Sequence, residues 1–476
     1  MKTLSELAGL VVRWENSFDD ARTWKRVAVV LFALMLARVR RTVTASIGVR
    51  GRNHAPWSAD YLAFSRANWK VDDIVEQVFL ASVETADQLC GADRPVVMAL
   101  DDTSVKKSSR VIAAAKYMRD PLSPPFHVNL RYGLRFVHSA LILPLHVLGA
   151  AARAIPVAFD LSPAVKRPGA RATDEEKAVY KVQKKQKKLT IAGLDRVIKL
   201  RKSLDKNGYA HRDLFIVADG SYTNRVMLKG MPARTEFVGR TRKDIRICQP
   251  APAGSRKVYG KPLPTPEAIR QDEEYLWLEA KIHYANALRP VRFKEVNKIL
   301  WQGGAQRRLL RLLIVAATPY RAPGKGKKKL QYNQPAYLLT TDLVTEASEL
   351  LQHYFDRWQE EVEHRDMKSE LGVGQAQVWS EASVAKFHTA YVAMWAMSKL
   401  AVLRVHGVER TEIYPERPDW YPQKRHHRAS ARDILEVYRD EAATKRMIAV
   451  QPTNELSQET ACFPNKSMPL LPKSPP

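Results

Sequence analysis

The sequence is poor in cysteine and lacks an apolar run long enough to cross a membrane. Its 476 residues include three cysteines, Cys90, Cys248 and Cys462, which are far apart and form no C-x-x-C pair. This spacing excludes a disulfide framework and a cysteine zinc site, and it fits a reducing, bacterial cytoplasm. The most apolar early run, Val27–Ala37, is far shorter than the roughly 20 residues that span a bilayer, so we interpret it as a buried helix.

Acidic residues are also scarce relative to basic ones. The chain has 77 lysines and arginines against 50 aspartates and glutamates, a net charge of +27. Such an excess predicts a polyanionic partner, with nucleic acid as the first choice and an anionic membrane surface as the second. Residues 161–202 are the densest basic segment, with 13 basic and 4 acidic residues around a Lys184–Lys188 core. This segment is either a surface that binds a polyanion or an ordinary solvated helix face.

Signatures of nucleotide binding are missing as well. The G-K-G-K run that begins at Gly324 does not have the spacing of a phosphate-binding loop. His364-Arg365-Asp366 is similar to a kinase catalytic loop, but Leu371 stands where that loop needs asparagine. We therefore expect no nucleotide cofactor.

Composition and periodicity divide the chain into five segments. Apolar residues at three- and four-residue spacing predict helices in the first segment, which either binds DNA or caps the next domain. Short apolar runs then predict a mixed sheet with helices on its faces. The expected strands are 95–100, 132–143, 154–161, 213–218 and 236–240, with one long helix at 174–204. The expected parts are a helical N-terminal domain (1–93), a core (94–244), a β-rich insertion (245–335), the rest of the core (336–405), and a basic C-terminal region with a disordered tail (406–476).

Two acidic positions fall where expected strands end. Asp102 ends the first strand and Asp219 follows the fourth. Sites in open α/β sheets form at the carboxyl ends of strands, and two carboxylates there are suited to hard divalent cations. Either aspartate alone is also a common turn residue. Asp101 competes with Asp102, because successive strand residues point to opposite faces and only one of them enters such a site.

A long helix expected at 345–370 carries a polar stripe. Tyr354, Arg357, Glu361 and Lys368 lie at offsets of 0, 3, 7 and 14 residues, within about 60° of one another on a straight helix. An adjoining apolar face would anchor the helix to the core; it consists of Leu351, Phe355, Trp358 and Val362. Surface pairing between charges also explains such a stripe, but it does not explain why the stripe adjoins the apolar face.

These residues match the signature Y-(2)-R-(3)-E-(6)-K, and the chain resembles bacterial insertion-sequence transposases of the IS4 group. The resemblance covers residues 94–380 and implies an RNase H-like fold, here a five-stranded mixed sheet interrupted by the insertion. It implies a catalytic, metal-binding trio of Asp102, Asp219 and Glu361. Asp102 is preferred over Asp101 because the family's pattern of Asp followed by Thr and Ser fits Asp102-Thr103-Ser104.

The resemblance also implies the chemistry. Two Mg²⁺ ions, with Mn²⁺ as a substitute, would support phosphodiester cleavage and strand transfer. Tyr354, Arg357 and Lys368 would contact DNA phosphates. A tryptophan of the insertion, Trp277 or Trp301, would either hold a flipped base or pack in the core. The expected partners are the element's terminal repeats and target DNA, with a second copy of the chain in a synaptic homodimer.

Two other functions stay open at this point. The net charge equally favours a catalytically inactive, transposase-derived DNA-binding protein. An RNA-directed nuclease or RNA binder is the third reading, although no RNA-recognition motif is present. The acidic trio argues for the enzyme, because three carboxylates without metal would repel a polyanion.

Overall fold

The computed structural model describes residues 2–120, 123–124, 126–305, 307–321, 330–416 and 428–450. The expected disordered tail from residue 452 onward lies outside these residues. Within them, no helix is long and apolar enough to cross a membrane.

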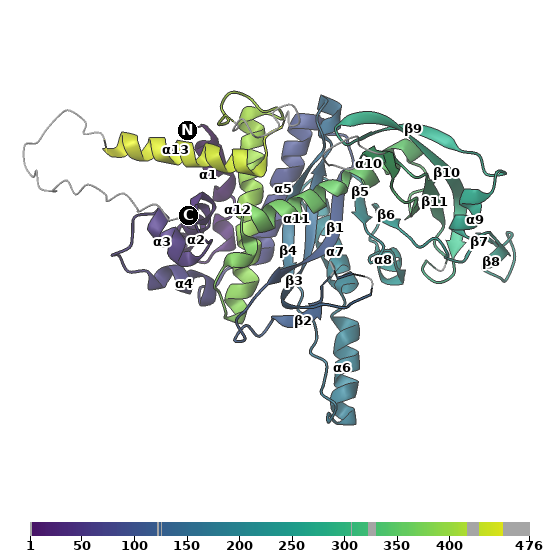
Figure 1. Cartoon of the computed structure of the whole chain (residues 1–476), viewed down its shortest axis with the longest axis horizontal. Helices are drawn as coiled ribbons and strands as arrows, with labels where there is room; N and C mark the ends of the chain where they lie inside the picture. Colours follow the sequence, from purple (N-terminus) through teal and green to yellow (C-terminus); the bar gives the residue numbers. More distant parts are fainter. Residues whose placement is uncertain are drawn as a thin grey trace, which may run out of the picture.

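Five helices form the first segment and pack around a sixth helix from the far end of the chain (Figure 1). The chain enters α2 through Asp20, whose carboxylate accepts hydrogen bonds from the backbone N–H groups of Arg22 and Thr23. The central helix α12 is buried along most of its length. Its apolar residues therefore belong to the same core as the N-terminal helices. The elements are α1 (Lys2–Val12), α2 (Ala21–Leu36), α3 (Val43–Val49), α4 (Ser58–Ser65), α5 (Val71–Cys90), α12 (Glu381–His406) and α13 (Ala431–Val450).

The sheet begins with the five strands that the sequence predicted. Strands β4, β3 and β1 are antiparallel neighbours, and β1, β5 and β6 continue from them as parallel neighbours. A short strand, β2, adds to the outer part of β3. The bounds are β1 (Val96–Lys106), β2 (Lys116–Arg119), β3 (Leu130–Leu143), β4 (Arg153–Leu161), β5 (Leu214–Ala218) and β6 (Thr235–Arg240).

The sheet nevertheless has twelve strands instead of five. The insertion continues it edge to edge, because β14 pairs with β6 and β11 pairs with β14. Strand β10 was not predicted, since Pro290 and several charges interrupt its pattern; it follows a hairpin turn at Ala285-Asn286, both with positive φ. The bounds are β7 (Ile247–Pro250), β8 (Tyr259–Pro262), β9 (Leu278–Tyr284), β10 (Ala287–Trp301), β11 (Leu310–Val315) and β14 (Ala336–Thr340), with a separate hairpin β12 (Pro319–Arg321) and β13 (Leu330–Tyr332).

The helices expected at 174–204 and 345–370 are each divided in two. The first breaks at Lys187-Lys188 into α6 (Asp174–Gln186) and α7 (Leu189–Lys206). Helix α7 packs on the sheet, whereas α6 has no buried residue and projects from the body of the molecule (Figure 1). The second breaks at Arg357 into α10 (Ala347–Asp356) and α11 (Trp358–Ser369). Two short helices are α8 (Arg225–Gly230) and α9 (Pro266–Gln271).

The two faces of the sheet are covered by different helices. Val97 and Ala99 of β1 share an apolar cluster with Leu350 of α10. On the opposite face, a Cβ added to Gly193 of α7 would lie 2.9 Å from the Tyr222 ring and 3.1 Å from Leu100. Because strand residues alternate, Asp101 faces the side of α10 and α11, whereas Asp102 faces the side of α7.

Candidate active site

The two predicted aspartates lie close together in the sheet. In the parallel pair of β1 and β5, Leu100 lies opposite Ala218, so Asp101 comes level with Asp219 and Asp102 lies one residue further along β1. Strand β1 does not end at Asp102 as expected but runs on to Lys106, because β3 pairs with it along this whole stretch. Asp219 follows the end of β5, and its carboxylate accepts a hydrogen bond from the backbone N–H of Ser221.

Electrostatics distinguish the two neighbouring aspartates of β1. Burial raises the pKa of Asp102. The charge of Arg135 opposes this rise, and the charge of Asp219 adds to it. Burial also raises the pKa of Asp101, to about 7, with the charge of Glu360 adding to the shift and that of Arg357 opposing it. The charges of Asp102 and Asp219 also raise the pKa of Glu360 on α11, so both aspartates of β1 interact electrostatically with that helix.

Tyr222 is a member of this site that the sequence did not reveal. Its side chain is fully buried, and its hydroxyl has no hydrogen-bond partner. Burial raises the pKa of Tyr222, and four carboxylates raise it further, those of Asp102, Asp101, Glu360 and Asp219. The phenol therefore lies at the point where the acidic groups converge. The only sequence signal was its position three residues after Asp219.

The break at Arg357 changes which side of α11 faces the sheet. The backbone N–H of Glu360 donates to the carbonyl of Arg357, three residues back, at 2.9 Å. Of the four expected anchors, Leu351 is buried, Phe355 and Val362 are half-buried, and Trp358 is 60% exposed. The expectation for Trp358 was wrong. The buried side of α11 instead consists of Glu360, Glu363 and Met367.

The residues of the predicted polar stripe, which runs from Tyr354 to Lys368, lie near the acidic side chains of the site. Arg357 Nη2 binds Glu361 Oε1 at 3.0 Å, and both side chains are half-buried. Burial would lower the pKa of Arg357, but the nearby acidic groups outweigh it and raise that pKa. Glu360 contributes most among them, followed by Tyr354, Glu361 and Asp101. Burial raises the pKa of Tyr354, and Asp219 and Glu361 contribute to that rise. Burial and Arg131 lower the pKa of Lys368, which Asp101 opposes.

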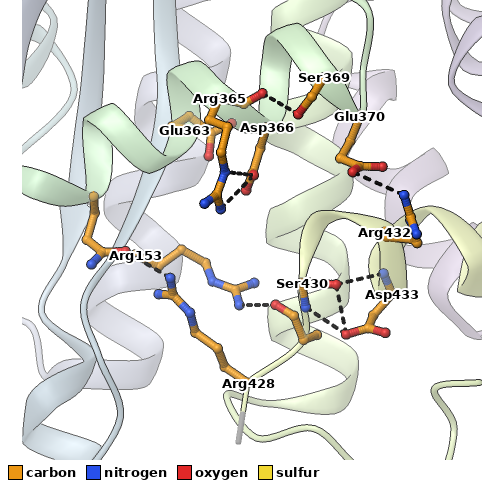
Figure 2. Close-up of polar contacts among 12 residues, drawn as sticks. Arg153, Glu363, Arg365, Asp366, Ser369, Glu370, Arg428, Ser430, Arg432 and Asp433 are labelled. Atoms are coloured by element: carbon orange, nitrogen blue, oxygen red, sulfur yellow. Dashed lines mark hydrogen bonds and ion pairs between the residues drawn. The ribbon is translucent and has the colours of Figure 1, made fainter. Parts of the chain in front are cut away.

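Contacts on the other side of α11 fix its position. Glu363 forms a buried ion pair with Lys399 and accepts a hydrogen bond from Trp395 Nε1 at 2.7 Å. Figure 2 shows how the segment that leads into α13 reaches this helix. Arg428 donates to Gln359 at 3.0 Å, and Arg432 pairs with Glu370 at 3.4 Å. Helix α11 is therefore held between the sheet, α12 and the C-terminal segment.

The metal-binding capacity of the site follows from its donors. Asp102 and Asp219 offer hard oxygen ligands, and their mutual repulsion is of the kind that a divalent cation relieves. Glu361 is engaged by Arg357 instead of lying against both aspartates in a tight cluster. Among the described residues, the acidic and histidine groups with ligand atoms within 4.8 Å of one another are His138, Glu360 and His364. Nothing in the sequence marked out His138, a single histidine in a largely apolar part of β3.

The two tryptophans of the insertion have different surroundings. The ring of Trp277 lies under two cations, with Lys294 Nζ at 4.7 Å and Arg292 Cζ at 5.1 Å from its centre. Trp301 packs partly against the main core. A role for either in holding a base stays a prediction.

Comparison with known families agrees with this geometry. The family model described as DDE superfamily endonuclease matches residues 14–308, which include Asp102 and Asp219 but end before Glu361. No curated protein matches the chain. The match covers more than half of the chain, whose large mixed sheet with flanking helices is consistent with a nuclease of this type. The chain belongs to the DDE superfamily endonucleases.

Proposed function

We propose that the protein is a DNA transposase of the IS4 group that cuts the ends of its own insertion sequence and joins them to target DNA. The observation that carries the proposal is the position of the Asp101-Asp102 pair beside Asp219, which directly follows the parallel strand β5, with the Glu361 helix packed across β1. The strand order β4-β3-β1-β5-β6 supports an RNase H-like core. The family match supports the nuclease class.

In this proposal Asp102, Asp219 and Glu361 bind two Mg²⁺ ions, which Mn²⁺ can replace. When bound, these ions activate the attacking oxygen and stabilise the leaving one in an in-line displacement. The protein residues have separate tasks. To act as a metal ligand, Glu361 must leave its ion pair with Arg357. Arg357 is then free to bind a DNA phosphate. Binding of DNA and assembly of the carboxylates are therefore coupled through one side-chain exchange.

The remaining residues of the stripe orient the DNA. Lys368 is exposed at the rim, suited to a backbone phosphate, and the Tyr354 hydroxyl donates a hydrogen bond to another phosphate oxygen. Cleavage by water leaves a 3′-hydroxyl on the element end. That hydroxyl then attacks a phosphorus of the target, and the target's own 3′ oxygen leaves. Because two ends must be joined, we expect a homodimer to hold both terminal repeats.

The test uses supercoiled plasmid that carries the element's flanks, purified full-length protein, and Mg²⁺, Mn²⁺ or EDTA. Asp219→Asn and Glu361→Gln should reduce end cleavage by at least about 10³-fold while DNA binding changes little. Asp366→Asn, on α11 but directed away from the trio, is the matched control. Cleavage that persists in both site variants would refute the assignment.

The same assay separates the two neighbouring aspartates and the alternative function. The family pattern assigns the role to Asp102, whereas the fold turns Asp101 toward the helix that carries Glu361. Loss of cleavage in Asp102→Asn with a measurable rate in Asp101→Asn would support Asp102; the reverse result would transfer the role to Asp101. Binding without breaks in either metal would favour the inactive, transposase-derived DNA-binding protein.

A further inference from the structure

A second group of potential ligands lies on the α11 side of the sheet, next to the proposed Mg²⁺ ligands but with no residue in common with them. His138 projects from β3, and Glu360 and His364 project from successive turns of α11. His138 Nδ1 lies 3.1 Å from Glu360 Oε1 and 2.9 Å from His364 Nε2. The break at Arg357 produces this arrangement, because it turns Glu360 inward.

These atoms are buried with too few hydrogen-bond partners. His138 and Glu360 are completely buried. Both Glu360 oxygens and His138 Nε2 have no hydrogen-bond partner. A buried carboxylate without donors costs several kcal/mol, and proteins remove such a cost by protonation or by binding a cation. His364 is half-buried and gives the cluster access to solvent.

The spacing fits a single metal ion. Zinc binds imidazole nitrogen and carboxylate oxygen at about 2.0–2.2 Å, so neighbouring ligand atoms lie about 2.9–3.4 Å apart. The two separations from His138 Nδ1 agree with these edges, and the ligand atoms of Glu360 and His364 lie within 4.8 Å of each other. An ordinary hydrogen bond explains either contact alone, but His138 Nδ1 has one lone pair or one proton and cannot serve both neighbours fully.

The two imidazoles also have the protonation state of metal ligands. Burial lowers the pKa of His138 to about 4, and burial places the pKa of His364 well below its usual range, so both rings are neutral at pH 7. Neutral imidazole is the form that binds metals. Asp101 and Glu363 add negative potential at His138, and Lys399 and Lys368 oppose it.

We propose that His138, Glu360 and His364 bind one transition-metal ion of the zinc type, which fastens α11 to β3. Two nitrogens and one oxygen favour such an ion over Mg²⁺, which prefers an all-oxygen set. Glu361 follows Glu360 directly, so this ion would position the proposed catalytic helix without contacting DNA. The inference rests on the cluster's geometry and does not require the cleavage reaction.

The experiment measures zinc and cobalt binding by untagged, full-length protein that has been stripped with EDTA. We expect one Zn²⁺ per chain, retained in millimolar Mg²⁺, and visible d–d absorption with Co²⁺. Glu360→Gln and His364→Ala should weaken binding by at least about 100-fold. His211→Ala removes an exposed histidine as the matched control and should bind like the wild type.

Two further variants make the result decisive. Asp219→Asn should abolish cleavage but keep zinc, so failure of the proposed function and failure of this site are distinguishable. Circular dichroism checks that each variant folds, and Glu360→Gln preserves side-chain shape if His364→Ala does not fold. Less than about 0.2 Zn²⁺ per chain, unchanged binding in both ligand variants, or loss of zinc in Asp219→Asn would each overturn the proposal.

Discussion

Helices α6 and α11 are nearly equal in length and both rich in charge, yet their surroundings are opposite. Helix α6 has 13 residues, none of them buried. Helix α11 has 12 residues and buries two glutamates and a methionine. Charge content therefore does not decide whether a helix lies at the surface. What decides is whether the rest of the fold supplies a partner for each charge.

The partners differ in kind. Helix α6 is stabilised locally, by a capping box between Thr173 and Glu176 and by the exposed pair of Asp174 and Lys177. Helix α11 is stabilised by partners distant in sequence, such as Lys399 and Trp395, which both bind Glu363. Changes in α11 should therefore affect global stability, and changes in α6 should not.

The largest expected effect is at the buried ion pair. Glu363→Ala leaves the Lys399 ammonium buried with only the Ala154 carbonyl as a partner, and it also removes the acceptor of Trp395. We expect a loss of about 3–5 kcal/mol in the free energy of unfolding, measured by urea denaturation.

Two controls accompany this variant. The double change Glu363→Met with Lys399→Met removes both charges and should restore most of the stability. Lys177→Ala breaks the exposed pair of α6 and should change stability by less than about 0.5 kcal/mol. Equal losses in Glu363→Ala and Lys177→Ala would contradict the comparison of the two helices.

A smaller, pH-dependent effect is expected at the end of α10. Burial raises the pKa of Asp356 to about 7, although a hydrogen bond from Gln352 opposes the shift. Between about pH 4 and pH 7 the folded state holds a proton that the unfolded state has lost. This contribution to stability is present at low pH and is lost as the pH rises through 7.

Asp356→Asn keeps an acceptor for Gln352 but cannot ionise. Relative to the wild type, the free energy of unfolding of this variant should rise by about 3 kcal/mol between pH 4 and pH 7, and level off by about pH 8. His353, whose pKa burial lowers to about 4, acts oppositely in both proteins and cancels in the difference. The difference therefore reports Asp356 together with His146, whose Nδ1 lies 3.5 Å from the Asp356 carboxylate. Asp174→Asn in exposed α6 is the control and should give a flat difference.

Local patterns predicted much of the fold. The five expected strands appear in order, with β2 added between the first two, because each is a short apolar run with turn residues around it. Their bounds are close to those expected except for β1, which runs on to Lys106. The polar stripe from Tyr354 to Lys368 could also be read from the sequence, since its members are close along the chain. The assignment of Asp102, Asp219 and Glu361 as ligands stays a prediction.

Other features depend on contacts that the sequence does not reveal. The break at Arg357 follows from distant partners of Glu360 and Glu363, which a straight 100° rotation per residue ignores. The continuation of the sheet through β14 depends on edge pairing with β6, for which no local pattern exists. The convergence of acidic groups on Tyr222 likewise requires β1, β5 and α11 together.

The smallest expected effect on stability, and a distinct effect on DNA binding, lies in α6. Lys181, Lys184 and Lys185 are exposed on one side of this helix, within about 100° of one another. Replacing all three with glutamine should change unfolding by less than about 0.5 kcal/mol. If they contact DNA phosphates, the slope of log binding constant against log salt should fall in magnitude by about 2–3.

The control variant Gln183→Ala with Gln186→Ala changes the opposite side of α6 and should leave the slope unchanged. An unaltered slope in the lysine variant would mean that these charges serve only to solvate α6, and the contrast with α11 would then be one of burial alone.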